Sequence, residues 1–245
     1  MKGMKNMERV FAVSDLHGNY ELWTKIKEFL YQDDKLYILG DCGDRCADGW
    51  KIIKEALADP RVTYIRGNHD QMLLDAWKNE WCSDDLYLWM YNGGQPTYDA
   101  IIADTIDYAL YLPQLARTKL YECYENKNGQ KIHLSHAGFT LHENDEIPEK
   151  HDLLWDRDHI EDHCDWWPKT NPNDYVVHGH TPTKTKEFRR LLVAFPDYYN
   201  INRSQTVIRY AHGHKICIDG AAFLTNCCAL LDLDTLQEIV ISTDL

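Results

Sequence analysis

The chain has 245 residues, of which 44% are hydrophobic, enough to bury one good core, so we expect a single domain spanning residues 1–245. Its formal charge of −13 argues against long nucleic acid or an anionic membrane as a partner, because their phosphates would be repelled. No apolar run approaches the ~18 residues of a membrane-spanning helix, and residues 1–9 lack the apolar core of a signal peptide. Eight cysteines without paired short spacings fit reduced thiols, so we expect a cytoplasmic protein.

Three short apolar runs near the N-terminus have the character of buried parallel strands, namely residues 10–13, 35–39 and 62–65. A polar motif follows each run: SDLHG with Asp15, GDCGDR with Asp41, and RGNHD with Asn68. Asp15 and Asp41 are 26 positions apart and Asp41 and Asn68 are 27, close to the ~30 residues of one βαβ unit. Because the loops that leave parallel strands lie along one sheet edge, we expect the three motifs to meet there.

The middle of the chain indicates a helical insertion followed by a hairpin. Residues from about 72 to 112 are aromatic-rich with a break at the two glycines 93–94, and we expect them to form a helical lid over the site. Residues 119–124 and 131–134 form two runs on either side of a turn that contains Asn and Gly, and this pattern predicts a β-hairpin. That hairpin would deliver His136 of the motif SHAG.

The last third of the chain continues with strands. A polar, acidic and Trp-rich connection, residues 143–174, precedes a predicted strand at 175–177, which leads to His180 of the motif HGHT. The tail contains three further apolar runs, which we expect to be antiparallel strands of a second sheet: residues 215–218, 229–233 and 238–241.

The residue types in the five motifs are those that hold a pair of borderline divalent cations, namely carboxylates, imidazoles and an amide. Asp15 and His17 are two positions apart, so both side chains lie on one side of an extended loop and can chelate one cation. The alternative is that Asp15 caps a helix and His17 is a surface histidine. Asn68 and His69 are adjacent and point different ways, so one can be a ligand and the other an acid.

The motifs resemble the calcineurin-like metallophosphoesterases, and within them the phosphoprotein phosphatase branch with its DxH, GDxxDR, GNH and GH signatures. The likeness extends roughly from Asp15 to Asp219. The phrases WMYNGGQPT, from Trp89, and LLWDR, ending at Arg157, are similar to those of compact bacterial and phage serine/threonine protein phosphatases and of the related diadenosine tetraphosphatases. The resemblance implies a four-layer α/β/β/α sandwich, classed as α/β or in some schemes as α+β, with a di-metal site at the strand C-termini.

The resemblance also implies a set of metal ligands: Asp15, His17, Asp41, Asn68, His136 and His180. Asp41 would bridge both cations. Either histidine of HGHT could bind, but the family pattern places the ligand directly after the glycine, which selects His180 and leaves His178 as a supporting or packed residue. Pro182 stands where the broader superfamily often has a further histidine, so the first cation keeps water in its shell. We expect two divalent metal ions, with manganese favoured and iron or zinc as alternatives.

The expected chemistry uses a hydroxide bridging the two cations, ~3.5–4 Å apart, as the nucleophile. His69 would give a proton to the leaving oxygen, with Asp44 holding the imidazolium charged and oriented. Arg45 offers a planar fork for two phosphate oxygens. Arg157 is expected as a second clamp on the phosphate, with a salt bridge to a neighbouring aspartate as the alternative.

We therefore predict a metal-dependent phosphomonoesterase, and more specifically a serine/threonine protein phosphatase acting on phosphorylated protein or a small phosphoester. The first alternative is a hydrolase of dinucleoside polyphosphates. The second is a catalytically silent metal-binding scaffold, against which the intact Asp44, Arg45 and His69 argue. No membrane or long nucleic acid is expected as a partner, and the oligomeric state is left open with a monomer favoured.

Overall fold

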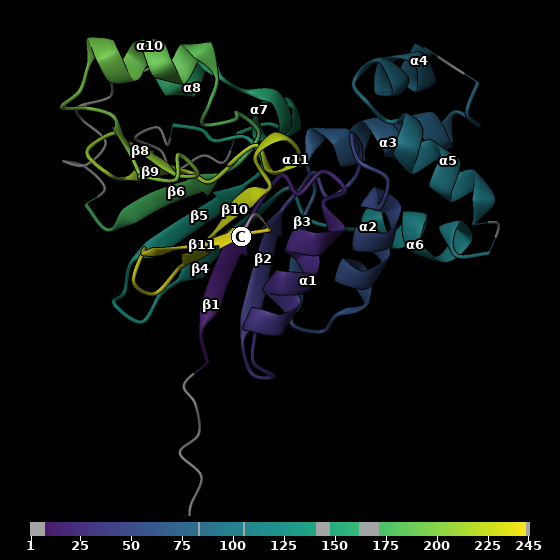
Figure 1. Ribbon diagram of the computed structural model, residues 1–245, viewed down its shortest axis with the longest axis horizontal. Helices are drawn as coiled ribbons and strands as arrows, with labels where there is room; N and C mark the ends of the chain where they lie inside the picture. Colours follow the sequence, from purple (N-terminus) through teal and green to yellow (C-terminus); the bar gives the residue numbers. More distant parts are fainter. Residues whose placement is uncertain (1–7, 83, 105, 141–147, 162–171, 244–245) are drawn as a thin grey trace, which may run out of the picture.

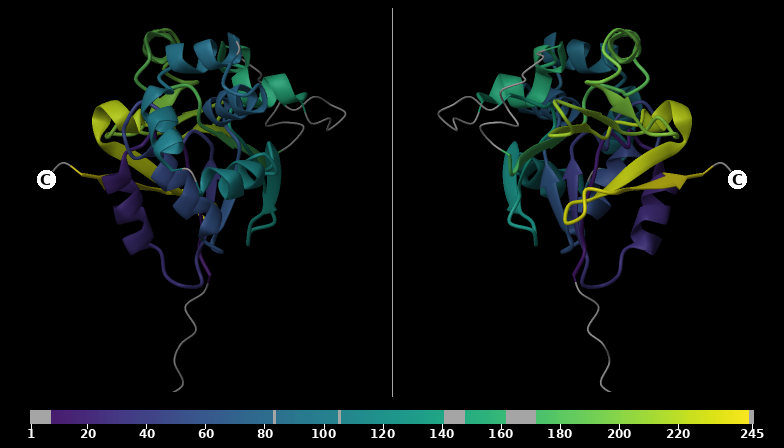
Figure 2. Two further views of the ribbon diagram at one scale, coloured as in Figure 1. Left: turned by 90° about the vertical axis from the view of Figure 1, so that its right-hand side faces the viewer. Right: turned by 90° about the vertical axis from the view of Figure 1, so that its left-hand side faces the viewer.

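Two β-sheets lie face to face at the centre of the molecule, and helices cover both outer sides (Figures 1 and 2). This computed structural model describes residues 8–82, 84–104, 106–140, 148–161 and 172–243. The predicted mixed α/β fold with a four-layer arrangement is confirmed. Much of the expected acidic connection, residues 143–174, lies outside the described residues.

The first sheet has the strand order β11-β10-β1-β2-β3. Strands β1 (Val10–Val13), β2 (Lys35–Leu39) and β3 (Val62–Ile65) are parallel neighbours, as predicted. Strands β10 (Cys227–Asp232) and β11 (Glu238–Ser242) extend the sheet antiparallel on the other side of β1. The expectation that these two strands belong to the second sheet was therefore wrong.

The reason is that β10 is buried on both faces. Cys228 and Leu230 pack in the core beneath the helices of the first sheet, whereas Ala229 and Leu231 pack between the two sheets. The sequence of such an apolar run does not indicate which sheet the strand joins. The pairing of Ala12 with Leu231, more than 200 positions apart in the sequence, places β10 in the first sheet.

The second sheet has the strand order β4-β5-β6-β9-β8-β7. Its strands are β4 (Tyr121–Glu125), β5 (Lys131–Ser135), β6 (Asp174–His178), β7 (Asn200–Ile201), β8 (Ile208–Tyr210) and β9 (Lys215–Cys217). The predicted hairpin is confirmed, because β4 and β5 are antiparallel neighbours. Strands β5, β6 and β9 are parallel, so the loops after β5 and β6 leave the sheet at the same edge.

The helices that accompany the first sheet are α1 (Tyr20–Phe29), α2 (Gly49–Ala58), α3 (Asn68–Lys78), α4 (Asp84–Tyr91), α5 (Gln95–Ala103) and α6 (Tyr108–Leu115). Those near the second sheet and the tail are α7 (Lys150–Trp155), α8 (Asp158–Glu161), α10 (Lys186–Ala194) and α11 (Ala222–Thr225). The segment expected as an insertion is helical, and α4 and α5 are separated at Gly93 and Gly94. None of the described helices combines the length and apolar character needed to cross a membrane.

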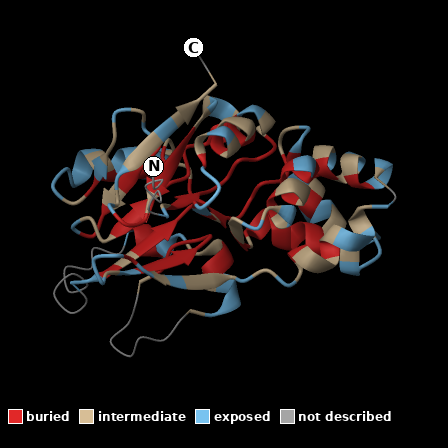
Figure 3. Ribbon diagram, turned by 90° about the horizontal axis from the view of Figure 1, so that it is seen from below, coloured by how far each residue is buried: buried red, intermediate tan, exposed pale blue. Residues whose placement is uncertain are grey.

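Three layers of buried side chains hold the sandwich together, and Figure 3 shows them concentrated in the strands and the inner helix faces. The first core lies between α1, α2 and the first sheet and includes Trp23, Ile38 and Ile53. The second lies between the sheets and includes Leu134, Val177 and Leu231. The third joins α10 to the outer face of the second sheet through Phe188, Leu191 and Ile208. The second core fixes the two sheets relative to each other.

A charged contact secures the start of β1 at the end of the sheet remote from the motifs. The carboxylate of Asp34, in the loop before β2, accepts hydrogen bonds from the backbone amide of Tyr31 at 2.8 Å and from Nε of Arg9 at 3.1 Å. Burial acts to raise the pKa of Asp34, but the hydrogen bonds from Arg9 and from the Tyr31 amide outweigh it and lower that pKa below 3.8.

Substituting Asp34→Asn is expected to lower the free energy of unfolding at pH 7 by about 1.5–3 kcal/mol, because a hydrogen-bonded charge is lost. Since the pKa of Asp34 is lower in the folded than in the unfolded protein, its stabilisation is complete above the unfolded value and is lost as the pH falls through the folded one. Urea unfolding in the presence of a chelator measures this effect. The difference in free energy of unfolding between the variant and the parent protein should be smaller near pH 3 than at pH 7. Asp33→Asn, at an exposed neighbour, is the control and should change little at either pH.

Candidate active site

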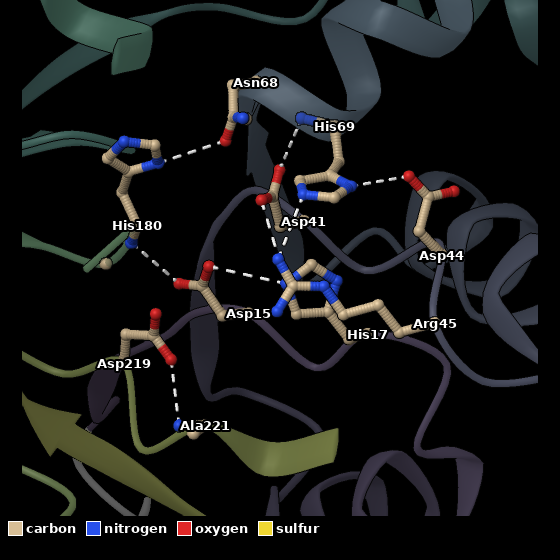
Figure 4. A network of polar contacts seen from close by, with 12 residues as sticks. Asp15, His17, Asp41, Asp44, Arg45, Asn68, His69, His180, Asp219 and Ala221 are labelled. Carbon is tan, nitrogen blue, oxygen red and sulfur yellow. Dashed lines mark hydrogen bonds and ion pairs between the residues drawn. The ribbon is translucent and has the colours of Figure 1, made fainter. Parts of the chain in front are cut away.

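The five polar motifs meet at the carboxyl ends of strands from both sheets. Asp15 and Asp41 each lie two residues beyond the end of their strand, β1 and β2, and Asn68 opens helix α3 after β3. His136 follows β5 directly and His180 lies two residues beyond β6. In Figure 4 the labelled side chains from these loops point toward one another. The expectation that the first three motifs meet at one edge of a sheet is confirmed, and each of the six expected ligands is buried.

The backbone of these loops is unusual. Six site residues have a positive φ between 44° and 68°, in the left-handed region that residues other than glycine seldom adopt: Asp15, His17, Asp41, Asp44, Arg45 and His180. Hydrogen bonds between loops hold this conformation, since the amide of Asp15 donates to the carbonyl of Gly40 and that of His17 to the carbonyl of Asp41. Strained conformations of this kind persist where the surrounding structure over-determines them, and they cluster at functional sites.

Two glycines allow the loops to approach the carboxylates closely. A Cβ atom at Gly67 would lie 2.0 Å from Oδ1 of Asp41, and one at Gly179 would lie 2.1 Å from Oδ2 of Asp15. Any side chain at either position would displace a buried carboxylate. The glycines of RGN and HGH are therefore required by this packing.

Three of the expected metal ligands, Asp15, His17 and Asp41, form a first group. His17 Nδ1 contacts the carbonyl of Gly43 at 2.9 Å, so its other ring nitrogen, Nε2, is turned into the site. This Nε2 lies 3.9 Å from Oδ1 of Asp15 and 3.9 Å from Oδ2 of Asp41. Those separations are too long for hydrogen bonds, but they suit atoms that share one cation at bond lengths of about 2.0–2.2 Å.

The second group shares Asp41 with the first. His136 Nδ1 contacts the carbonyl of Leu39 at 2.7 Å, which leaves Nε2 to face Oδ1 of Asn68 at 2.8 Å and Oδ2 of Asp41 at 3.3 Å. His180 Nδ1 lies 3.1 Å from the same Asn68 oxygen. The backbone carbonyl behind His136 fixes its tautomer, as is usual for histidines that bind metals. A carboxylate, an amide oxygen and two imidazoles therefore converge on one point.

The charges at the site also fit a pair of divalent cations. Burial raises the pKa of Asp15 to about 6, with His136 opposing and the charge of Asp41 adding to the rise. Burial, followed by the charge of Asp15, also holds the pKa of Asp219 well above its usual value. Among the described residues, neither Asp15 nor Asp41 has a lysine or arginine in an ion pair. Buried like charges of this kind are costly unless a cation compensates them.

A second cluster, of Asp44, Arg45 and His69, lies beside the ligands. His69 Nδ1 contacts Oδ2 of Asp44 at 2.6 Å, and Nη2 of Arg45 lies 3.2 Å from His69 Nε2. Burial acts to lower the pKa of His69, but the carboxylates of Asp41 and Asp44 outweigh it and raise that pKa. His69 also lies within reach of His17 and Asp41, so its proximity to the ligands alone does not distinguish an acid from a ligand. The contact with Asp44 is what favours the acid.

Arg157 and His178 lie near His180. Arg157 is exposed and lines a cavity of about 500 Å³ together with Thr181 and Pro182, directly after His180. Among the described residues it forms no ion pair with its neighbouring aspartates, so the alternative expected from the sequence is not observed there. His178 is fully buried, and its ring nitrogens contact the carbonyl of Gly179 at 3.0 Å and the hydroxyl of Tyr210 at 2.8 Å.

Two buried aspartates support the site although the sequence did not assign them a role. Oδ2 of Asp70 accepts hydrogen bonds from the amide of Asp41 at 3.1 Å and from that of Gly67 at 2.9 Å, so it joins two motif loops. Burial raises its pKa to about 7, with the charge of Asp41 adding to the rise. Asp219 accepts from the amide of Ala221 at 2.9 Å, and Figure 4 places it beside Asp15. The only signal for Asp70 was its place directly after the GNH signature.

Comparison with known proteins agrees with this geometry. Serine/threonine-protein phosphatase 1 of Salmonella typhimurium is 37% identical over 93 residues, which are 37% of this chain and 41% of that protein, so the match spans less than half of this relative. Serine/threonine-protein phosphatase 2 of Escherichia coli is 26% identical over 184 residues, covering 70% of this chain and 78% of that protein.

Solved structures share the fold at low sequence identity. A crystal structure provisionally assigned as a diadenosine tetraphosphatase matches with a TM-score of 0.59 and 16% identity, over 98% of this chain and 96% of its own. A protein serine/threonine phosphatase from Saccharomyces cerevisiae matches with a TM-score of 0.53 and 11% identity, over 97% of this chain and 81% of its own. The profile of the calcineurin-like phosphoesterases matches residues 8–215. With most of its length covered by that profile, the chain belongs to the calcineurin-like phosphoesterase family.

Proposed function

We propose that this member of a family of phosphoester hydrolases is a metal-dependent phosphomonoesterase that acts on phosphoserine and phosphothreonine in proteins. The observation that carries the proposal is that Asp41 belongs to two groups of buried side chains that could each hold a metal ion, one with His17 and His69 and one with Asp15 and His136, next to the contact between His69 and Asp44. The names of the two relatives from Salmonella typhimurium and Escherichia coli support the substrate class. The protein would work in the cytoplasm as a single domain, with α4–α6 as a lid.

In this proposal the first cation is held by Asp15, His17 and Asp41. The second is held by Asp41, Asn68, His136 and His180. When bound, the pair supplies Lewis-acid polarisation of the phosphate and a water of lowered pKa. The chain's own contribution is to fix the donor atoms, since Gly43 and Leu39 orient the two histidine rings through their carbonyls. Manganese is the proposed metal because oxygen-rich mixed ligands suit it.

His69 is proposed to donate a proton from Nε2 to the leaving oxygen, while Asp44 holds Nδ1. The guanidinium of Arg45 lies 3.2 Å from the same Nε2, so a phosphate bound by Arg45 has its ester oxygen within reach of the proton. The ring of Phe223 lies 4.4 Å from the Arg45 guanidinium carbon and supports it from the other side. Arg157, on the rim beside His180, is proposed as a second clamp for the phosphate oxygens.

The competing proposal for the same site is hydrolysis of dinucleoside polyphosphates. The metal chemistry would be identical, and the structural likeness to a diadenosine tetraphosphatase extends to the fold alone at 16% identity. A silent metal-binding scaffold is a third candidate. It has no need for the contacts that join Asp44, His69 and Arg45, which disfavours it.

Removal of metal should abolish the activity, because the proposed cations supply most of the polarisation of the phosphate. Protein stripped by a chelator is expected to lose at least about 10³-fold in kcat/KM and to regain it on addition of manganese, with two ions per chain at saturation. Elemental analysis alongside the assay measures both quantities. Full activity in metal-free protein, or saturation at one ion per chain, would contradict the two-metal proposal.

The substrate class can be tested by a direct ranking. Phosphoserine or phosphothreonine peptides are expected to be hydrolysed with a higher kcat/KM than diadenosine tetraphosphate, under identical metal concentrations. Release of phosphate and of nucleotide, followed side by side, gives the ranking. The reverse order would favour the dinucleotide hydrolase and leave the metal site itself unaffected.

The proposed acid, His69, and the proposed bridging ligand, Asp41, should respond differently to substitution. His69→Asn is expected to keep both metal ions while lowering kcat by about 10²–10⁴-fold, with a smaller loss for nitrophenyl esters, whose leaving group departs without a proton. Asp41→Asn should instead lose metal as well as rate, because it weakens the carboxylate between the cations. If His69→Asn loses metal to the same degree, or affects good and poor leaving groups equally, the acid has been assigned wrongly.

A further inference from the structure

We propose that Trp89 is a positioning residue for the proton donor, and that the segment from Trp89 to Thr97 holds the loop of Asp44 and Arg45 in its working conformation. The inference rests on the proposed function of the site, because it concerns the step that His69 and Asp44 are proposed to perform. It gives this part of the helical insertion a role besides that of a lid.

The central contact is a hydrogen bond between two buried side chains. Nε1 of Trp89, in helix α4, donates to Oδ2 of Asp44 at 2.8 Å. The same carboxylate oxygen contacts Nδ1 of His69 at 2.6 Å. Trp89 has no exposed surface and Asp44 is 1% exposed, so water does not replace either contact. With an N–H on each side of Oδ2, the carboxylate cannot rotate away from His69 without leaving a buried donor unpaired.

The indole ring is itself fixed in place. A Cβ atom at Gly94 would lie 2.6 Å from Cε2 of Trp89, so the ring packs directly against the backbone at this glycine. The rings of Trp81, in the turn after α3, and Tyr98, in α5, lie 6.1 Å and 6.3 Å from that of Trp89 and pack against it. The direction of the indole N–H is therefore set by the packing of the insertion and not by Asp44.

The same segment also holds the backbone of the loop. Asp44 and Arg45 have φ angles of 68° and 65°, a conformation that costs free energy for residues with side chains. The amide of Asp44 donates to Oγ1 of Thr97 at 2.7 Å, and the amide of Arg45 donates to the carbonyl of Gly93 at 2.9 Å. Three hydrogen bonds thus run from this segment to two consecutive residues, one to the carboxylate and two to the backbone.

These contacts separate the proton donor from the metal ligands. Within the described parts of the chain, the hydrogen bonds from the segment 89–97 to the site end at Asp44 and Arg45, and none reaches an expected ligand. A change at Trp89 should accordingly disturb proton transfer and leave metal binding intact. This distinction is what a test can measure.

The test compares Trp89→Phe with Trp50→Phe. Trp50 is a matched control, because its buried indole also donates to an aspartate, Asp104, at 2.9 Å, and the other side-chain hydrogen bonds of Asp104 within the described residues run to Lys54 and Asp107, outside the site. Trp89→Phe is expected to lower kcat on a phosphoserine peptide by about 10–100-fold, the range for one hydrogen bond to a charged group. The loss on nitrophenyl phosphate should be under about 3-fold, with two metal ions retained. Trp50→Phe should match the parent enzyme on both substrates.

A double-mutant cycle shows whether Trp89 acts through Asp44. In an Asp44→Ala background, which removes the acceptor for both Trp89 and His69, Trp89→Phe is expected to change kcat by less than about 2-fold, because the contact it supports is already lost. A full further loss in that background would overturn the inference. So would equal losses for both leaving groups, or loss of metal from Trp89→Phe.

Thr97 provides a second route if Trp89→Phe does not fold. Thr97→Val removes the acceptor for the Asp44 amide at nearly constant volume, whereas Thr97→Ser keeps it. The valine variant should show the same selective loss on the phosphoserine peptide, and the serine variant should restore kcat; equal behaviour of the two would overturn the inference.

An inactive parent enzyme would overturn the proposed function together with this inference. An active parent in which Trp89→Phe behaves like Trp50→Phe would overturn this inference alone.

Discussion

The carboxylate of Asp41 is the point on which the other parts of the site depend. Its Oδ2 faces His17 Nε2 at 3.9 Å and His136 Nε2 at 3.3 Å, and its Oδ1 accepts the amide of His69 at 3.0 Å. With the buried Asp15 nearby, it places two negative charges where, among the described residues, neither has a lysine or arginine partner. Folding around such a pair is unfavourable unless cations are available. The left-handed loops and the close glycines are the structural means by which this charge is held in place.

The site also requires both sheets. Asp15, Asp41 and Asn68 are delivered by the first sheet, whereas His136 and His180 are delivered by the second. The second group of ligand atoms consequently exists only when the apolar core between the sheets has formed. In the proposed metal site, the donor atoms from the two sheets would come together only where both sheets are packed, and strand ends hold such side chains more rigidly than free loops.

In the function we propose, metal binding and proton transfer would be supported by different parts of this architecture. The ligands are oriented by carbonyls of the strand ends, such as those of Leu39 and Gly43. The contact between Asp44 and His69 is oriented from the other side, by Trp89 in the helical insertion.

The first three strands, the hairpin before His136 and the residues that gather at the strand ends could be predicted from the sequence alone. They follow from local periodicity and from the spacing of the motifs, which are short-range properties. The place of β10 and β11 in the first sheet could not be predicted in this way, because an apolar run buried on both faces is compatible with either sheet and long-range pairing sets the outcome. The contacts of Asp70 and Trp89 were likewise beyond the sequence, since a hydrogen bond between side chains depends on the direction each takes after packing. The pattern of residues specifies which groups are present, and long-range packing specifies which atoms meet.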